Sequence, residues 1–257
     1  MKTTAVVFAS MLLVICGTTV AADEQRQPLY INVECMKSTS AGYTDIEIDI
    51  WQPMHQELVK QGQRNSWALY HVLYADGSRC DYYTVTSYVG NEQLNSTPDY
   101  EAVFSKVHPK KNFERAMAAT AGARQRVTSE LWEAVDATHI NAHRFAIVNL
   151  MSAADPDAYE RMETRVFKPG HQQLVDGGHR AGWAMYRLVS PIGSSIPYNY
   201  STVDFSNQLS PVPMAEAMLA AHPDRDLDAI QKLLQLREQV RSETWVRVAA
   251  TEPTGQD

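Results

Sequence analysis

The sequence contains two copies of one segment, and this internal repeat restricts the possible folds more than any other feature. Residues 51–78 align without gaps on residues 167–194, at an offset of 116 positions (171 minus 55). Identical pairs in this alignment include Pro53/Pro169, His55/His171, Leu58/Leu174, Gly62/Gly178, Arg64/Arg180, Trp67/Trp183 and Tyr70/Tyr186. The similarity continues, with small shifts, as far as Trp132 and Trp245. The chain is therefore predicted to fold as two tandem modules of one design.

Each copy has the same order of predicted elements. A run rich in β-forming residues opens each copy, and apolar residues at helical spacing follow it. Two strands joined at a turn come next, then a helical region broken at a His-Pro pair, and a closing strand. The first copy has these elements at Leu29–Met36, Tyr43–Lys60, Ser66–Tyr74, Tyr82–Val89, His108-Pro109 and Leu131–Asp136; the second has them at Arg144–Met151, Ala158–Val175, Gly182–Val189, Tyr198–Phe205, His222-Pro223 and Thr244–Ala250. The order β-α-β-β-α-β is the ferredoxin-like arrangement.

Proline within each long helix predicts a local irregularity. Pro53 and Pro169 lack the backbone N–H that a helix interior uses, so each is expected to kink its helix. Gly62 and Gly178 then suit the helix ends, where a left-handed residue is common.

The first 22 residues have the layout of a secretory signal peptide. Lys2 gives a basic start, residues 5–16 are apolar, and small residues precede Asp23. The apolar run is shorter than the roughly 20 residues that a membrane span needs. We therefore expect a secreted or periplasmic protein with no membrane span: a leader at residues 1–22, a linker at 23–28, a first module at 29–139, and a second module with a C-terminal tail at 140–257. In a eukaryotic host, Asn95 and Asn199 would be glycosylation acceptors.

Charge and cysteine content indicate which partners and which covalent cross-links to expect. Lys and Arg number 23 against 30 Asp and Glu, and no basic run occurs, so a nucleic-acid partner is not expected. Cys35 and Cys80 remain after the leader, and an even number in an exported chain suggests a disulfide, with two separate buried thiols as the alternative. In the ferredoxin-like order the first and third strands are antiparallel neighbours, which favours the bridge. The second copy has Leu150 in place of the first cysteine, so the bridge is expected in one module.

The pattern resembles the dimeric α+β barrel superfamily. The third predicted element is apolar on both faces, with Trp67, Leu69 and Leu73 on one side and Ala68, Tyr70 and Val72 on the other. Members of that superfamily pair two such sheets face to face, and some carry both on one chain. The resemblance implies an α+β fold of two ferredoxin-like modules that pair within a monomer. The segment 51–56 also resembles that of exported bacterial proteins of unassigned function.

The resemblance implies several activities. The superfamily includes cofactor-free monooxygenases of aromatic and polyketide substrates, lactone isomerases, haem-handling proteins and plain binding proteins. A small apolar ligand cavity usually lies between the sheet and its helices.

His55 and His171 are the foremost candidate site residues. A neutral imidazole that faces a cavity could act as a general base or as a haem ligand. The alternative is a packed histidine that bonds a carbonyl freed by the proline. Glu34, whose counterpart is Asn149, is predicted in mid-strand, where a carboxylate either faces a wet cavity or pairs with Arg64 or another cation.

The remaining candidates each have a structural alternative. Aromatic residues that line a pocket are expected at Trp67, Tyr70, Trp183 and Tyr186, although strands favour aromatic core residues in any case. Arg64 and Arg180 could clamp a carboxylate or make a salt bridge at the helix end. His139 and His143 have i,i+4 spacing but no third ligand, so we expect no metal site and no cofactor.

Three functional hypotheses follow. The first is an exported protein with a pocket for a small apolar or aromatic molecule, and if it is an enzyme, a cofactor-free monooxygenase or isomerase with a histidine base. The second is a non-catalytic binding or structural module, and the third is a haem-binding protein. Because Glu34 and Met54 become Asn149 and Gly170 in the second copy, any activity is expected in one half only.

Overall fold

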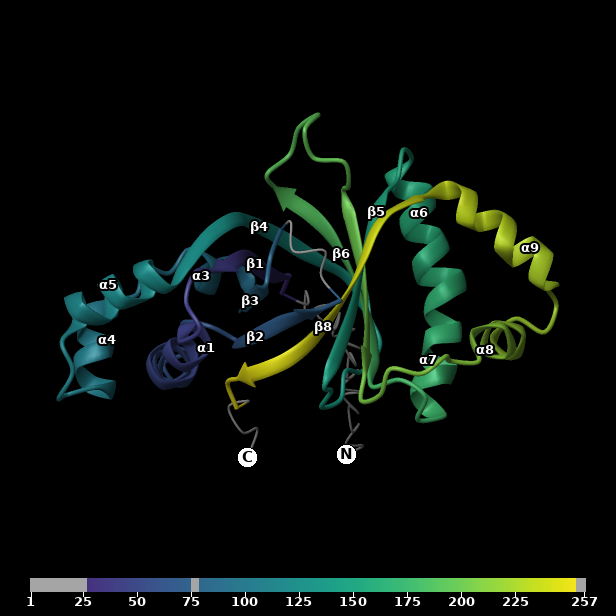
Figure 1. The fold of residues 1–257 in the computed structure, drawn as a ribbon. Helices are drawn as coiled ribbons and strands as arrows, with labels where there is room; N and C mark the ends of the chain where they lie inside the picture. Colours follow the sequence, from purple (N-terminus) through teal and green to yellow (C-terminus); the bar gives the residue numbers. More distant parts are fainter. Residues whose placement is uncertain (1–26, 75–78, 253–257) are drawn as a thin grey trace, which may run out of the picture.

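Eight antiparallel strands close into one barrel in the computed structural model of the chain (Figure 1). The strand order is β1-β3-β2-β8-β5-β7-β6-β4, and β4 pairs with β1 to complete the barrel. The structure describes residues 27–74 and 79–252, so the predicted leader at residues 1–22 and the predicted turn at Asp76-Gly77 lie outside the described residues.

The two halves of the chain contain corresponding elements. The first half contains β1 (Leu29–Ser38), α1 (Tyr43–Ile46), a π-helical turn (Glu47–Trp51), α2 (Gln52–Lys60), β2 (Ser66–Leu73), β3 (Tyr82–Val89), α3 (Gly90–Leu94), α4 (Tyr100–Val107), α5 (Phe113–Ala123) and β4 (Arg124–Ala137). The second half contains β5 (Phe145–Ser152), α6 (Pro156–Met162), a π-helical turn (Glu163–Phe167), α7 (Lys168–Asp176), β6 (Gly182–Ser190), β7 (Tyr200–Ser206), α8 (Met214–Ala221), α9 (Leu227–Lys232), a 3₁₀ turn (Leu233–Leu236) and β8 (Glu238–Ala250).

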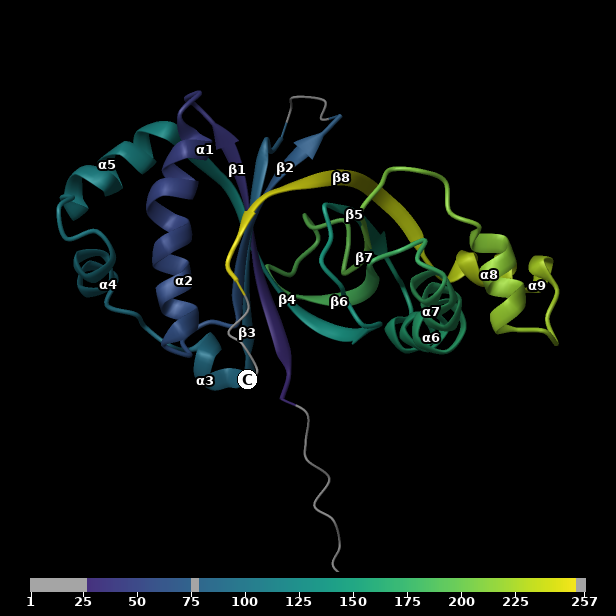
Figure 2. The same ribbon diagram turned by 90° about the horizontal axis from the view of Figure 1, so that it is seen from below.

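Each half has the ferredoxin-like strand order. The first half runs β4-β1-β3-β2 and the second runs β8-β5-β7-β6. The halves join where β2 pairs with β8 and where β4 pairs with β6. Figure 2 shows the helices of the two halves on opposite outer sides of the barrel. The predicted α+β fold, two ferredoxin-like modules paired within one chain, is confirmed.

The alternating strand residues divide into two sets of core side chains. Tyr70 and Tyr186 lie in the barrel interior, within the largest buried apolar cluster. Trp67 on β2 and Trp183 on β6 are each 1% exposed. They lie on the outer face of the barrel sheet, beneath the helices. This is the period-2 alternation of strands that are buried on both faces.

A π-helical turn accommodates the proline in each long helix. The turn ends two residues before Pro53 and two residues before Pro169, and π turns of this kind interrupt the regular i→i−4 bonding. His108 Nε2 donates to the carbonyl of Ile50 at 3.1 Å. In the second half, His222 Nε2 donates to the carbonyl of Val166 at 2.7 Å. The histidines that bond carbonyls of this turn are therefore those of the two His-Pro pairs, whereas the sequence had suggested His55 and His171.

The ends of several elements differ from the prediction. Gly62 and Gly178 terminate α2 and α7 with φ of +70° and +71°, as expected. The closing strands are longer than predicted, since β4 begins at Arg124 and β8 at Glu238. Their first residues are mostly exposed and polar, so no apolar alternation marks them; their pairing with β1 and β5 defines them.

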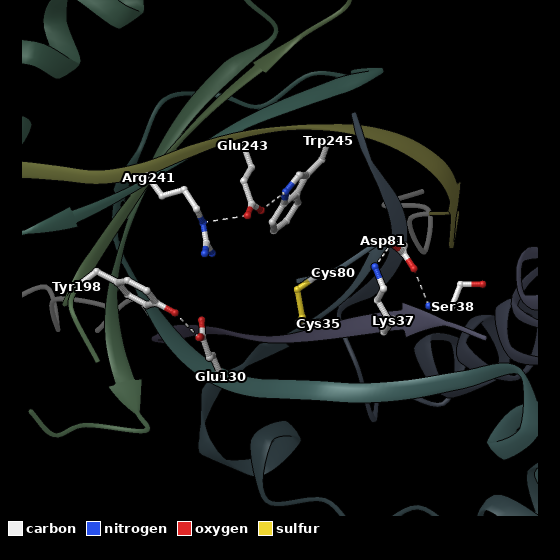
Figure 3. Close-up of a disulfide and its surroundings, with 10 residues drawn as sticks. All are labelled: Cys35, Lys37, Ser38, Cys80, Asp81, Glu130, Tyr198, Arg241, Glu243 and Trp245. Carbon is white, nitrogen blue, oxygen red and sulfur yellow. Dashed lines mark hydrogen bonds and ion pairs between the residues drawn. A yellow bond between two sulfur atoms is a disulfide. The ribbon is translucent and has the colours of Figure 1, made fainter. Parts of the chain in front are cut away.

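Cys35 and Cys80 form the predicted disulfide (Figure 3). Their Cα atoms are 5.4 Å apart, and the bridge joins the end of β1 to the residues before β3. Within the described part of the chain, no helix is both long and apolar enough to span a membrane.

Candidate functional site

A cavity of about 360 Å³ lies between the sheet and the helices of the first half. Tyr100 on α4 and Met117 on α5 are its most exposed lining residues, 37% and 43%, and they mark its mouth. The cavity is lined by Asn32, Glu34, Glu47, Trp51, His55, Arg64, Trp67, Thr84, Thr86, Tyr88, Tyr100, Phe113, Met117 and Arg124. Four predicted site residues, Glu34, His55, Arg64 and Trp67, thus meet at one cavity.

A His-Arg-Trp cluster at this cavity is repeated in the second half. An Arg64 Nη donates to His55 Nδ1, and the His55 ring stacks on Trp67 with ring centroids 4.7 Å apart and planes within 8°. In the second half, Arg180 donates to His171 Nδ1, and His171 stacks on Trp183 at 4.9 Å and 12°. A glycine with left-handed backbone conformation follows α2 and another follows α7. The loop that begins there places the arginine beside the histidine of the preceding helix.

The arginine fixes the chemistry of each imidazole. Burial, and after it the nearby guanidinium, hold the pKa of His55 and of His171 well below the usual value, so both rings are neutral. Because Nδ1 accepts the arginine N–H, the proton of the neutral ring is on Nε2. Each ring therefore presents an N–H donor, and neither nitrogen offers a free lone pair.

That geometry does not fit a haem ligand. Iron coordination needs an unprotonated ring nitrogen, but Arg64 occupies Nδ1 of His55 and the proton occupies Nε2. The same applies to His171 and Arg180.

Three of the charged groups at the cavity, Glu34, Glu47 and Arg124, are paired with an opposite charge. Glu47 pairs with Arg124 at 2.6 Å. Glu34 pairs with Arg126 at 2.9 Å and accepts from Thr84 Oγ1 at 3.4 Å. The sequence left open whether Glu34 faces a wet cavity or pairs with Arg64 or another cation; Glu34 lines the cavity, and the cation that it pairs with is Arg126.

Arg64 differs from these groups. Its side chain is buried, with 7% of the residue exposed, and its Nη groups donate to His55 and to the Tyr100 hydroxyl. Its Nε is buried with no hydrogen-bond partner. Among the described residues, Arg64 makes no ion pair, so the cavity has one uncompensated cation in its wall.

The second half neutralises the corresponding cation. Arg180 pairs with Asp204 at 2.8 Å. Asp204 lies opposite Trp183 in the β6–β7 register, and Thr86 lies opposite Trp67 in the β2–β3 register. A carboxylate in one half is therefore replaced by a hydroxyl in the other, directly beside the cavity.

Solved structures with the same architecture were found, although no family model and no curated protein matches the chain. A protein from Lactobacillus acidophilus NCFM, provisionally assigned as a monooxygenase, matches at 9% identity with a TM-score of 0.53, covering 88% of this chain and 96% of its own. A second provisionally assigned monooxygenase, from Fusobacterium nucleatum subsp. nucleatum ATCC 25586, matches at 9% identity with a TM-score of 0.52, covering 91% and 98%. With the closed barrel of two ferredoxin-like halves, these matches decide the fold. This chain has the dimeric α+β barrel fold.

The interior of this dimeric α+β barrel contains a second, smaller space. It measures about 80 Å³ and includes Tyr70 and Tyr186 in its wall, so these two predicted ligand residues lie apart from the His55 cavity. Its carboxylates are already bonded: Glu130 accepts from Tyr198 at 2.6 Å, and Glu243 accepts from Trp245 at 2.9 Å (Figure 3). Burial raises the pKa of Tyr70 to about 12. This space is therefore a small gap in the apolar core of the barrel.

The linker histidines have separate surroundings. His143 Nε2 bonds the Tyr70 hydroxyl at 3.0 Å, and its ring lies 4.5 Å from that of Phe205. His139 lies in the loop between β4 and β5. No group of three metal-ligating side chains occurs among the residues that the structure describes.

A Tyr-Glu-Arg group that the sequence patterns did not identify joins the start of the long helix to the last strand region of each half. In the first half it is Tyr43, Glu47 and Arg124, with the guanidinium carbon 5.9 Å from the Tyr43 ring centroid. Its counterpart is Tyr159, Glu163 and Arg237. The offset of 116 extends upstream to these tyrosines and glutamates, so a longer alignment of the two copies contains the signal.

We expect Glu163 to make stability depend on pH. Burial raises its pKa from 4.5 to about 7, and Arg237, at 3.7 Å, opposes this shift only in part. Between these values the folded chain holds a proton that the unfolded chain releases, so the unfolding free energy falls as pH rises through the window, by about 3 kcal/mol in all. Urea unfolding between pH 4.5 and 7.5 measures this fall of the unfolding free energy with pH. In Glu163→Gln the part that Glu163 contributes should be absent. An unchanged slope would show that Glu163 titrates normally.

Proposed function

We propose that this chain is an exported small-molecule-binding protein whose ligand, a small aromatic compound, occupies the cavity of the first half. The observation that carries the proposal is the composition of the cavity wall. The cavity measures about 360 Å³, and its wall combines aromatic side chains with the polar groups of a few convergent residues. The aromatic side chains are those of Trp51, Trp67, Tyr88, Tyr100 and Phe113. Ligand pockets commonly have volumes of about 300–1,000 Å³ and a similar mixture of apolar and polar lining residues.

Export is supported by two independent features. The first 22 residues have the pattern of a signal peptide. The Cys35–Cys80 disulfide belongs to the oxidising compartments outside the cytoplasm.

Binding fits the site better than proton abstraction by His55. A general base must accept a proton, and the His55 Nδ1 already accepts from Arg64 while its pKa is lowered by burial. The ring is suited to donate from Nε2 to a ligand acceptor. The bulk of the ligand would then contact the aromatic wall, and His55 with Arg64 would bind its polar end.

Filling the cavity should abolish binding. Thr84 is buried on β3 at the cavity wall. Thr84→Phe places a ring in the space that a ligand would use, so the affinity for phenol should fall at least about tenfold, the equivalent of 1.4 kcal/mol. Isothermal titration or saturation-transfer NMR measures this, with the fold checked by chemical unfolding, since overpacking costs about 1–3 kcal/mol.

The matched control adds the same ring elsewhere. Ser105 is exposed on α4, so Ser105→Phe adds an aromatic side chain without touching the cavity, and phenol binding should be unchanged. Equal affinity of phenol for wild type and Thr84→Phe would contradict binding in this cavity.

A further inference from the structure

We infer that the ligand of this cavity is an anion, a small aromatic carboxylate, whose carboxylate binds Arg64 in the place that Asp204 occupies beside Arg180. The inference rests on the proposed function, because it specifies the chemistry of a ligand in the same cavity. It goes beyond that proposal in naming the charge and the residue that recognises it.

Among the residues that the structure describes, one cation at the cavity has no carboxylate partner. Arg124 is paired with Glu47, and Glu34 is paired with Arg126. His55 is neutral. Arg64 is the remaining charged lining residue, and the described residues provide no carboxylate for it. Because a buried charge is costly without a partner, an anion in the cavity would be bound with a large electrostatic gain.

The second half shows how the same cluster is neutralised. His171, Arg180 and Trp183 repeat the arrangement of His55, Arg64 and Trp67. There Asp204 supplies the carboxylate at 2.8 Å from the guanidinium. In the first half, Thr86 occupies the corresponding strand position and also lines the cavity. The site for an oxygen anion is thus present in both halves, and only the second half fills it with its own side chain.

The Arg64 guanidinium has five N–H groups, and the described residues do not use all of them. Arg64 uses one Nη for His55 and the other for Tyr100, whereas its Nε–H has no partner. In the second half, Asp204 contacts Nη1 of Arg180. A carboxylate in the corresponding place would contact Nη1 of Arg64, which carries two N–H groups and uses one of them for His55. The aromatic wall beside Arg64 would contact the ring of the ligand.

Benzoate and benzamide test the inference, because they have nearly the same shape and differ in charge. We expect wild type to bind benzoate about 10- to 100-fold more tightly than benzamide, the range of a hydrogen bond to a charged group. In Thr86→Asp, the new carboxylate should pair with Arg64 and reduce benzoate affinity at least about tenfold, with less than about a threefold change for benzamide. Thr86→Asn, which adds bulk without charge, should keep the preference for benzoate.

A second variant keeps the test decisive if Thr86→Asp folds poorly. Arg64→Gln should remove the preference for benzoate while benzamide still binds. Equal binding of both probes to wild type, or an unchanged preference in Arg64→Gln, would overturn the inference. If both probes bind equally and Thr84→Phe abolishes both, the cavity site stands and only the anion assignment fails. If neither probe binds at millimolar concentration, the proposed cavity site fails with it.

Discussion

Asp204→Thr is expected to destabilise the chain by about 3–5 kcal/mol, the usual cost of removing one partner of a buried ion pair. The side chains of Arg180 and Asp204 are only 9% and 15% exposed, so water cannot replace the lost carboxylate fully. The variant gives the second half the residue that the first half has at Thr86. Urea unfolding at neutral pH measures the loss.

The control removes both charges. Arg180→Met/Asp204→Thr removes the buried cation together with its carboxylate, so it should recover most of the stability lost in the single variant. A single variant within about 1 kcal/mol of wild type would show that Arg180 does not need its carboxylate. The lack of a carboxylate beside Arg64 would then be no reason to expect an anionic ligand there.

Removal of the disulfide has the other large expected effect. Cys35→Ala/Cys80→Ala should lower the unfolding free energy by up to about 4 kcal/mol, since the bridge closes a loop with a sequence separation of 45. Both cysteines are also buried in the barrel-interior cluster, at 2% and 6% exposed.

Reduction provides the matched measurement. Wild type with dithiothreitol should lose a similar amount, and the double variant should not respond to the reductant. A variant as stable as oxidised wild type would show that the barrel strands, rather than the bridge, hold β1 and β3 in register.

The fold could be predicted from the sequence because its determinants are local or repeated. The aligned copies give the number of modules, and two-sided apolar strands such as Trp67–Leu73 require cover on both faces. The antiparallel neighbours β1 and β3 then place Cys35 near Cys80. The early part of β4 was missed because its residues are polar and exposed, and only its pairing with β1 defines it.

The candidate site was predictable only in part. His55, Arg64, Trp67 and Glu34 come from elements that the pattern identified, and they meet at the cavity. Tyr70 was grouped with them, but its position in the alternation of β2 turns it into the barrel interior. The exchange of Thr86 for Asp204 becomes interpretable only when the strand register places each residue opposite the tryptophan of its His-Arg-Trp cluster. The cavity itself depends on how α4 and α5 pack, which local patterns do not determine.

The central claim is that the ligand site lies in the first half, between the sheet and its helices. Crystals soaked with 4-iodophenol test it most directly, because the iodine gives an anomalous signal that locates the compound without assumptions about the site. We expect a peak within the cavity lined by Trp51, Trp67 and Phe113. A peak in the second half near His171, or no ordered peak in the first-half cavity, would contradict the account.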